Sequence, residues 1–399
     1  MTVVRPPGYR LRVRYVTIVS SGSGRRAAAC PVNARQTLNR TGDGIQRPSP
    51  TRGNKMIRAA LTASKYLAAA FAAALIAASA WAAEDCKNRG VLDSLYCDED
   101  GDMVADLPKD KSKWKDPSTL VFTYTPVEDP AVYKQAFAPF IAYLEKATGK
   151  KVIYYTVHSY AAELEALRSG RLHIAGVSTG PTGFGVNLSG YVPIAVKGYA
   201  DGFQGYHLIL IVRKDSPFQK PADLKGKKVA HTTASSNSGN LAPRVLLPKQ
   251  GLTPEKDYKV IFSGKHDQSV LGVNSGDYDG APVASDVFER MCTRGTVKCE
   301  NFRIIYKSPK FPTSSFGYAH DLHPDLAKKI RQAFNDFRFT EEMKKQFGGA
   351  DRFSPITYKA DWAVVREIAE ATGESYTREQ YEKAAAKEAE KLKKKKMKK

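Results

Sequence analysis

Small hydroxyl and amide side chains crowd residues 232–241, which read TTASSNSGNL. The segment follows a predicted strand and opens a predicted helix, where the first backbone N–H groups have no partner inside the helix. Those N–H groups and the helix dipole attract an anion, and hydroxyl groups add donors without adding charge. A helix N-cap needs only one such residue, so the surplus favours oxyanion binding over a simple cap. We therefore predict ligand-binding roles for Ser235, Ser236, Asn237 and Ser238.

A second group of small donors ends a strand earlier in the chain. The predicted strand 172–177 is followed by Ser178 and Thr179, just before another predicted helix. In open α/β sheets ligands bind at this carboxyl edge of the strands, so we expect the two donor groups to face one cleft. Neither group has the Gly-Lys-Ser/Thr ending of a nucleotide-binding phosphate loop.

One histidine and three tyrosines are further candidates for the pocket. His266 follows a predicted strand and begins a helix, so it can contact an oxyanion as a neutral donor or as a cation. The alternative is a surface position at a helix start that Asp267 caps. Tyr124, Tyr160 and Tyr206 stand at strand ends or crossing points and are predicted to line the pocket, although each alone is more often a packing residue.

The sequence contains none of the common catalytic motifs beside these donors. It has no Gly-x-Ser-x-Gly nucleophile and no His-Glu-x-x-His zinc motif, and its seven histidines are not spaced closely with carboxylate pairs. We therefore predict no enzymatic activity, no cofactor and no metal ligands in the site.

One acidic segment has a spacing of its own. Residues 98–106 read DEDGDMVAD, which places Asp98, Asp100, Asp102 and Asp106 in a pattern similar to the calcium loops of thrombospondin-type repeats. Met103 replaces the second glycine usual in such loops, and the segment occurs once. A solvated acidic turn is the favoured interpretation, and a calcium loop is the alternative.

The elements that must position these residues follow from the pattern of apolar residues. Short apolar runs and amphipathic stretches alternate from residue 118 onward and predict strands at 120–124, 152–157 and 172–177 with helices at 130–148 and 161–168. This order predicts a mainly parallel sheet with helices on both faces. A strong strand at 208–212 then leads into a second α/β block, after which the chain returns to the first.

The basic character of the chain is concentrated at its two ends. The 399 residues hold 62 Lys and Arg against 41 Asp and Glu, a formal net charge of +21. Residues 1–83 account for +12 and residues 383–399 for +7, so residues 84–382 carry only +2. A near-neutral body excludes a broad footprint on a phosphate backbone, and no nucleic-acid partner is expected. The Lys-rich tail, 376–399, is interpreted as solvated, with contact to anionic lipid as the alternative.

The N-terminal region predicts export. Residues 1–55 are interpreted as disordered or as an extension from a start assigned too early. From Met56 a positively charged stretch, the apolar run 66–78 and the small residues at 80–82 predict a cleaved signal peptide over 56–82 and a periplasmic mature protein. A membrane anchor is the alternative, although the run barely reaches spanning length.

Cysteine spacing agrees with an oxidising compartment. The mature chain holds four cysteines in two close pairs, Cys86 with Cys97 and Cys292 with Cys299. This spacing predicts two small disulfide loops, with unlinked thiols as the alternative, and it does not fit a zinc site. The first pair belongs to a polar segment, 83–117, which we call the preface.

Several segments together resemble the periplasmic phosphonate-binding proteins of ABC importers, the phosphate/phosphite/phosphonate group. They are 122–126 (FTYTP), 159–163 (SYAAE), 170–175 (GRLHIA), 205–207 (GYH), 212–217 (VRKDSP), 223–227 (DLKGK), 236–239 (SNSG) and 264–266 (GKH). The resemblance covers residues 118–375 and implies an α/β, type II periplasmic binding protein fold. Two α/β lobes, 118–207 with 309–375 and 208–308, would be joined by two crossing strands around a ligand cleft.

The resemblance also implies a function, which is binding without catalysis. A monomeric protein would close over one phosphonate, phosphite or phosphate oxyanion and deliver it to an ABC permease in the inner membrane. The family's phosphonate-holding cluster falls on Ser236, Asn237 and Ser238, its anion-contacting histidine on His266, and its pocket tyrosines on Tyr160 and Tyr206. The alternatives are a periplasmic sensing subunit and an enzyme acting on phosphate esters in the same cleft.

Three departures from the family pattern concern the choice of ligand. Of the two acidic residues that hold a ligand amine in the family, one matches Asp286, a shorter side chain than the expected Glu, and the other falls near the uncharged Ser314. The first-lobe loop, 176–180, lacks the usual aromatic residue. These departures favour a smaller anion, such as phosphite, methylphosphonate or phosphate, over an aminoalkyl ligand.

Overall fold

The computed structural model describes residues 86–383 and 386, which all belong to one compact unit, Ser79–Lys399. The predicted extension 1–55, the predicted signal peptide 56–82 and most of the Lys-rich tail lie outside the described residues and stay predictions. Within the described part of the chain, no helix is both long enough and apolar enough to cross a bilayer.

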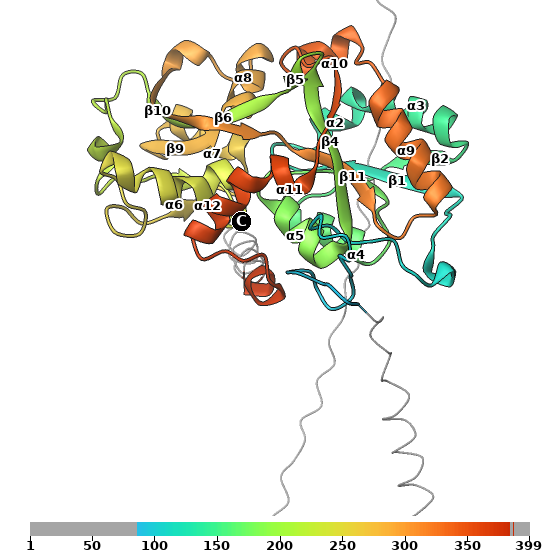
Figure 1. Cartoon of the computed structure of the whole chain (residues 1–399). Helices are drawn as coiled ribbons and strands as arrows, with labels where there is room; N and C mark the ends of the chain where they lie inside the picture. Colours follow the sequence, from blue (N-terminus) through green and yellow to red (C-terminus); the bar gives the residue numbers. More distant parts are fainter. Residues whose placement is uncertain (1–85, 384–385, 387–399) are drawn as a thin grey trace, which may run out of the picture. The chain divides into compact units, whose positions relative to one another are not determined.

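A seven-stranded mixed sheet forms the core of the first lobe (Figure 1). Its order is β12-β4-β11-β3-β1-β2, with β5 beside β4. The strands are β1 (Thr119–Tyr124), β2 (Lys151–Tyr154), β3 (Ile174–Val177), β4 (Tyr191–Tyr199), β5 (Gly202–Phe203), β11 (Ser315–Ala319) and β12 (Arg352–Pro355). β1 pairs in parallel with β2 and β3, whereas β11, β4 and β12 pair antiparallel. β5 also pairs antiparallel with β4, so four of the six pairings are antiparallel and the prediction of a mainly parallel sheet is wrong.

Helices pack on this sheet and bury its aromatic residues. They are α2 (Ala131–Ala136), α3 (Ala138–Thr148), α4 (Tyr160–Arg168), α5 (Pro181–Ser189), α9 (Pro324–Asp336), α10 (Glu341–Gln346), α11 (Tyr358–Asp361) and α12 (Ala363–Ala371). The predicted helix 130–148 is two helices, because Pro139 fits the first turn of α3 but has no N–H to continue α2. Phe122, Phe140 and Phe353 lie in the core of the lobe, with ring centroids 5.9 Å apart for the first two and 4.8 Å for the last two.

The second lobe is built on a smaller sheet. Antiparallel strands β10, β6 and β9 lie side by side, and the parallel pair β7 and β8 joins them through a bridge between Val229 and Gly280. The elements are β6 (Gly205–Arg213), β7 (Ala230–His231), a π-helical turn (Asn237–Leu241), α6 (Ala242–Leu246), β8 (Ile261–Phe262), α7 (His266–Ser275), β9 (Gly280–Ala284), α8 (Ser285–Thr293) and β10 (Phe302–Pro312).

Two long strands connect the lobes. β6 and β10 pair antiparallel along most of their length, from Phe302 opposite Arg213 to Pro312 opposite Gly205. The predicted boundaries between the lobes, 207/208 and 308/309, fall inside these two strands. The exact residues at which one lobe ends and the other begins stay a prediction. The α12 helix adds another link, because it packs against α6 and the π-helical turn of the second lobe.

The described part of the preface, 86–117, packs against the first lobe. The Cys86–Cys97 disulfide closes its first loop, and the Cys292–Cys299 disulfide closes a loop after α8, which confirms both predicted pairs. Tyr96 is buried and donates to the carbonyl oxygen of Leu188 at 3.3 Å.

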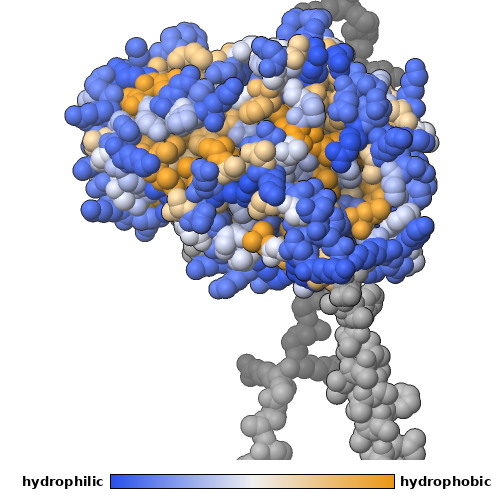
Figure 2. Space-filling model, viewed as in Figure 1, coloured by the Kyte–Doolittle hydropathy of each residue, from blue (hydrophilic) through white to orange (hydrophobic). Residues whose placement is uncertain are grey.

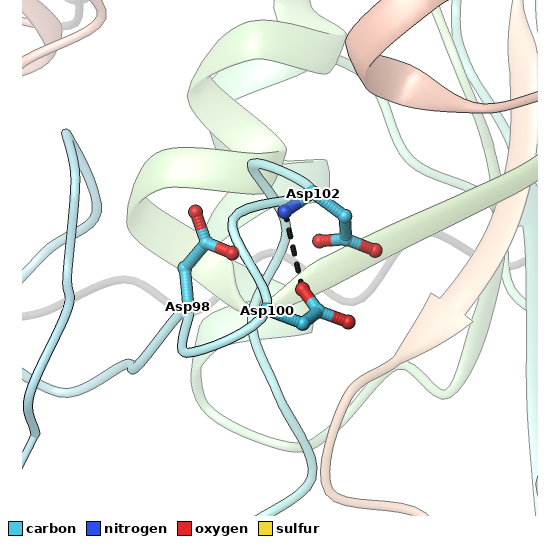
Figure 3. Close-up of side chains that lie close together, drawn as sticks. All are labelled: Asp98, Asp100 and Asp102. Carbon is cyan, nitrogen blue, oxygen red and sulfur yellow. Dashed lines mark hydrogen bonds between the residues drawn. The ribbon is translucent and has the colours of Figure 1, made fainter.

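The outer face drawn in Figure 2 is mostly hydrophilic, with apolar residues scattered in small groups. The carboxylates of Asp98, Asp100 and Asp102 lie close together on one loop of the preface (Figure 3).

Candidate functional site

A small cavity of about 20 Å³ lies where loops of both lobes meet. Its lining is Tyr124, Val127, Ser178, Thr179, Tyr206, Ser236, Asn237, Ser238, His266, Ala284, Asp286, Val287, Thr313 and Ser314. Most of these residues lie at or just after the ends of β1, β3, β7, β8 and β9, whereas Tyr206 lies in β6 and Thr313 and Ser314 lie between β10 and β11. A cavity of this size has room for about one water-sized group, so the lining residues of the two lobes lie close to one another.

The structure brings together nine of the eleven predicted ligand-binding residues in this lining. The two others, Tyr160 and Ser235, do not line the cavity. Tyr160 is the first residue of α4 and is buried. Ser235 precedes the cavity-lining residues, and its backbone oxygen faces Gly180 of the first lobe.

The segment after β7 supplies donors from the second lobe. Ser236 Oγ accepts a hydrogen bond from Gly239 N at 3.2 Å, which leaves its own proton free to donate. Asn237 Nδ2 donates to the hydroxyl of Tyr206 at 3.1 Å and so ties the segment to β6. Ser236, Asn237 and Ser238 are each at most 2% exposed. In place of one regular helix, the structure has a π-helical turn followed by the five residues of α6, so side-chain donors matter more here than a helix dipole.

His266 is a neutral donor in this structure. Its side chain is buried, and burial lowers its pKa to about 4. Its Nδ1 accepts a hydrogen bond from Ala284 N at 3.1 Å, so in the neutral ring the proton is on Nε2. That nitrogen lies 3.4 Å from Ser236 Oγ. Of the two roles predicted for His266, the geometry favours the uncharged donor.

The first lobe supplies further hydroxyl groups. Thr179 Oγ1 donates to the carbonyl oxygen of Pro312 at 3.0 Å, which fixes the loop after β3 against the end of β10. Tyr124 donates to Ser314 Oγ at 3.2 Å. Burial raises the pKa of Tyr124 well above its usual value, so the phenol keeps its proton.

One polar lining residue was not named in the sequence analysis. Thr313 is 1% exposed, and its Oγ1 has no hydrogen-bond partner among the described residues. It opens the run Thr313-Ser314-Ser315 at the end of a strand, which is the same signal that identified the other donor groups. The run is therefore a third donor group.

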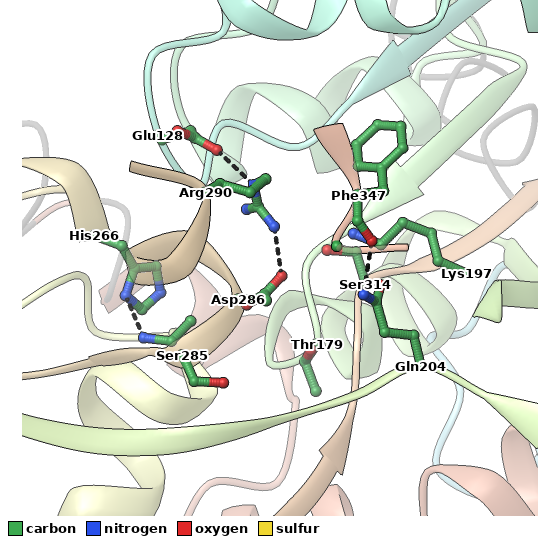
Figure 4. Close-up of polar contacts among 12 residues, drawn as sticks. Glu128, Thr179, Lys197, Gln204, His266, Ser285, Asp286, Arg290, Ser314 and Phe347 are labelled. Carbon is green, nitrogen blue, oxygen red and sulfur yellow. Dashed lines mark hydrogen bonds and ion pairs between the residues drawn. The ribbon is translucent and has the colours of Figure 1, made fainter. Parts of the chain in front are cut away.

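A buried chain of charges lies beside the cavity (Figure 4). Arg290 of α8 donates from Nη1 to Asp286 at 2.8 Å and from Nε to Glu128 of the first lobe at 3.1 Å. Arg294 also pairs with Glu128. Burial alone would raise the pKa of Asp286, but Arg290 and Lys197 outweigh it and hold that pKa below its usual value. Asp286 therefore enters the cavity as an anion that Arg290 already balances.

Lys197 stands behind the cavity without lining it. It is 0% exposed, its Nζ donates to the Tyr124 hydroxyl at 3.4 Å, and the ammonium lies 4.9 Å from the ring centroid of Phe347 (Figure 4). Burial, followed by the charge of Arg290, lowers its pKa to about 8. The side chain is still mostly protonated at pH 7. It adds positive potential behind Tyr124, which separates it from the cavity.

The lobes touch directly at the cavity. Backbone N–H of His266 donates to the carbonyl oxygen of Val127 at 3.1 Å, and backbone N–H of Asp129 donates to Asp267 at 3.1 Å. A Cβ added at Gly180 would lie 2.1 Å from the backbone oxygen of Ser235. The structure therefore has the lobes closed over the cavity.

A family model described as the ABC transporter, phosphonate, periplasmic substrate-binding protein matches residues 122–362. The chain belongs to this family. The match covers most of both lobes, so the protein is a substrate-binding component of an ABC transporter and not an enzyme. The family is periplasmic.

Individual relatives agree with this assignment. The Phosphate-import protein PhnD of Mycolicibacterium smegmatis is 29% identical over 297 residues, which are 67% of this chain and 90% of that protein. The probable phosphite-binding protein PhnD1 of Prochlorococcus marinus is 24% identical over 58% of this chain and 77% of that protein. The solved structure of PhnD1 with methylphosphonate superposes with a TM-score of 0.58 at 20% identity, over 65% of this chain and 99% of that chain, which shows the shared fold.

Proposed function

We propose that the protein binds one compact phosphorus oxyanion, namely phosphite, methylphosphonate or phosphate, in the cavity between its lobes. The observation that carries this proposal is the lining itself, in which uncharged hydroxyls, an amide and a neutral imidazole surround about 20 Å³. Hydrogen bonds from such donors to an anion are strong inside a dry site, because water does not compete for them.

The charged residues beside the cavity argue against an aminoalkyl ligand. Asp286 is paired with Arg290 through Oδ2 and is not a free counter-ion for an amine. Ser314, at the second position where the family holds an amine, is uncharged. We expect the ionised Asp286 instead to accept a hydrogen bond from a ligand that carries one acidic P–OH group. Sulfate has no such proton at neutral pH, so we expect the site to reject it.

The names of the relatives support the same chemical class. One relative is named for phosphate import, another for phosphite binding, and a protein of similar fold was solved with methylphosphonate. All three anions are small, and the lining has to widen from its present volume of about 20 Å³ to admit one of them. We further propose that the mature protein is a periplasmic monomer, exported by the predicted signal peptide, and that its closed form docks on an inner-membrane permease.

Isothermal titration calorimetry tests the ligand. The purified protein is titrated with phosphite, methylphosphonate, phosphate, 2-aminoethylphosphonate and sulfate. We expect tight one-to-one binding of one of the first three anions and no heat with sulfate. Tightest binding of 2-aminoethylphosphonate, or no binding of any phosphorus anion, would overturn the proposal.

The adjacent serines 235 and 236 provide a matched pair of variants. Ser236→Ala removes a lining donor, and because a hydrogen bond to a charged group contributes about 1.5–3 kcal/mol, we expect about tenfold to hundredfold weaker binding. Ser235→Ala changes the same side chain outside the lining and should leave the affinity within about twofold. Equal losses in both variants would contradict the assignment of the cavity as the ligand site.

A further inference from the structure

The acidic loop of the preface, 98–106, lies outside the oxyanion cavity and has no role there. Carboxylate oxygens of Asp98, Asp100 and Asp102 lie within 4.8 Å of one another (Figure 3). Like charges at this separation repel each other unless a cation or protons compensate them. The basic side chain seen in a salt bridge at this loop, Lys109, pairs with Glu99 at 2.5 Å.

A second observation concerns Asp98, whose buried side chain has one carboxylate oxygen without a hydrogen-bond donor among the described residues. Its side chain is 4% exposed, and Oδ2 accepts a hydrogen bond from Met103 N at 3.2 Å. Oδ1 is shut off from solvent and has no hydrogen-bond partner among the described residues. A buried carboxylate oxygen without a donor is costly, and such oxygens are usually paired or bound to a metal ion.

The order of donors in the loop matches what a hard cation needs. Counted from Asp98, aspartates stand at positions 1, 3, 5 and 9, which are ligand positions of a helix–loop–helix calcium loop. Position 6 of such a loop is a glycine that makes a sharp turn, and here Met103 adopts the required left-handed backbone with φ 72°. Backbone N–H of Asp102 and Val104 donate to Asp100 and Asp102, at 3.1 Å and 2.9 Å, and hold the loop in this form.

We propose that this loop binds one calcium ion through the carboxylates of Asp98, Asp100 and Asp102, with Asp106 as a further ligand. Position 12, where a bidentate glutamate completes a helix–loop–helix site, is Lys109. The site therefore resembles the weaker extracellular calcium modules, with a dissociation constant of roughly 0.1–1 mM. Such an affinity suits a protein outside the cytoplasm.

The ion would stabilise the attachment of the preface to the first lobe. Asp98 directly follows the disulfide-bonded Cys97, and Val104, within the loop, packs into the core of the lobe. Lys359 of α11 donates to the carbonyl oxygen of Gly101 at 2.9 Å, so the loop also contacts the C-terminal part of the chain. The oxyanion cavity involves none of these residues, and calcium should leave oxyanion binding unchanged.

Calorimetry and thermal unfolding of the purified, EDTA-treated protein test the proposal. We expect one calcium ion per chain and a rise in melting temperature with CaCl₂ that MgCl₂ does not reproduce. Asp98→Asn should weaken calcium binding at least tenfold. Asp100→Asn, an exposed position that does not endanger folding, should do the same. Glu99→Gln is the matched control, because it removes one charge from the same loop outside the cluster and should keep calcium binding.

Three results would overturn the calcium site. The first is no calcium binding up to about 10 mM, well beyond the range of weak extracellular sites. The second is binding that survives both Asp98→Asn and Asp100→Asn, because the ion would then lie elsewhere. The third is an equal loss in Glu99→Gln, or an equal response to magnesium, which would mean general charge screening.

Discussion

Gly180 lies where the two lobes touch, and replacing it with alanine tests whether ligand affinity depends on that contact. The backbone of Gly180 has φ −69° and ψ −51°, which alanine adopts without strain. The new Cβ would lie 2.1 Å from the oxygen of Ser235 and 2.7 Å from the nitrogen of Asn237, both backbone atoms of the other lobe. The substitution therefore affects the closed arrangement and leaves each lobe free to fold.

The size of the effect follows from these distances. Ordinary contact begins at 3.4 Å, so the lobes must separate by about 1.3 Å at this point to accommodate the methyl group. Crowding of one methyl group in a packed region costs about 1–3 kcal/mol. Because the cost applies only to the closed form, which holds the ligand, we expect binding to weaken about 5- to 150-fold.

Calorimetry with the cognate oxyanion measures this change, and the melting temperature of the ligand-free protein checks the fold. Gly185→Ala, in the helix α5 that follows Gly180, is the matched control. Its Cβ would meet Leu164 at 3.2 Å and Tyr191 at 3.4 Å, both inside the first lobe, so affinity should change little. Unchanged affinity in Gly180→Ala, or an equal loss in Gly185→Ala, would refute the argument that this contact forms on closure around the ligand.

Two further predictions concern buried charges. Glu128→Gln removes the carboxylate that pairs with Arg290 across the lobes. Truncating one partner of a buried charge pair costs about 2–5 kcal/mol, so we expect calorimetry to show at least about tenfold weaker oxyanion binding. Wild-type affinity in this variant would contradict a role of the pair in closure. Burial lowers the pKa of Lys197 from 10.5 to about 8, so the charged form destabilises the folded state below pH 8 and the cost disappears as pH rises toward 10.5. Lys197→Met should therefore melt above the wild type at pH 7 and lose that advantage near pH 10, whereas a pH-independent difference would contradict the assignment.

Apolar runs alone predicted the centre of the fold but not its antiparallel edge. The strands that became β1, β3 and β6 are short, apolar and bounded by turn residues, so they are recognisable without their neighbours. β4 contains Pro193 and shows a register shift against β11 between Phe316 and Gly317. Such a segment becomes a strand because β11 and β12 pair with it on either side, and this information is not local.

The candidate site was accessible to sequence analysis for a chemical reason. Oxyanion binding by uncharged donors needs residues that are small and polar and that stand at the end of a strand. Both the residue type and the end of the strand can be recognised from local sequence for Ser178, Thr179 and the 236–238 segment. The charges around the cavity were not accessible in this way. Glu128 meets Arg290, which stands 162 positions later in the chain, only once both lobes have folded, and Lys197 reaches Tyr124 across the sheet.

The placement of charge explains how such a site can bind firmly and still release its ligand. A direct salt bridge to the anion would need a buried cation in the cavity, and that cation would be left unpaired each time the ligand departed. Here Arg290 has its own partners, Asp286 and Glu128, in the closed arrangement and needs no ligand to balance its charge. In the proposed site, hydroxyl groups and the neutral His266 would meet the ligand charge, and Lys197 would act only through Tyr124. Opening the lobes would separate Glu128 from Arg290 and would move the first-lobe donors away from the second-lobe donors. We therefore expect closure, more than any one contact, to determine whether the anion is held.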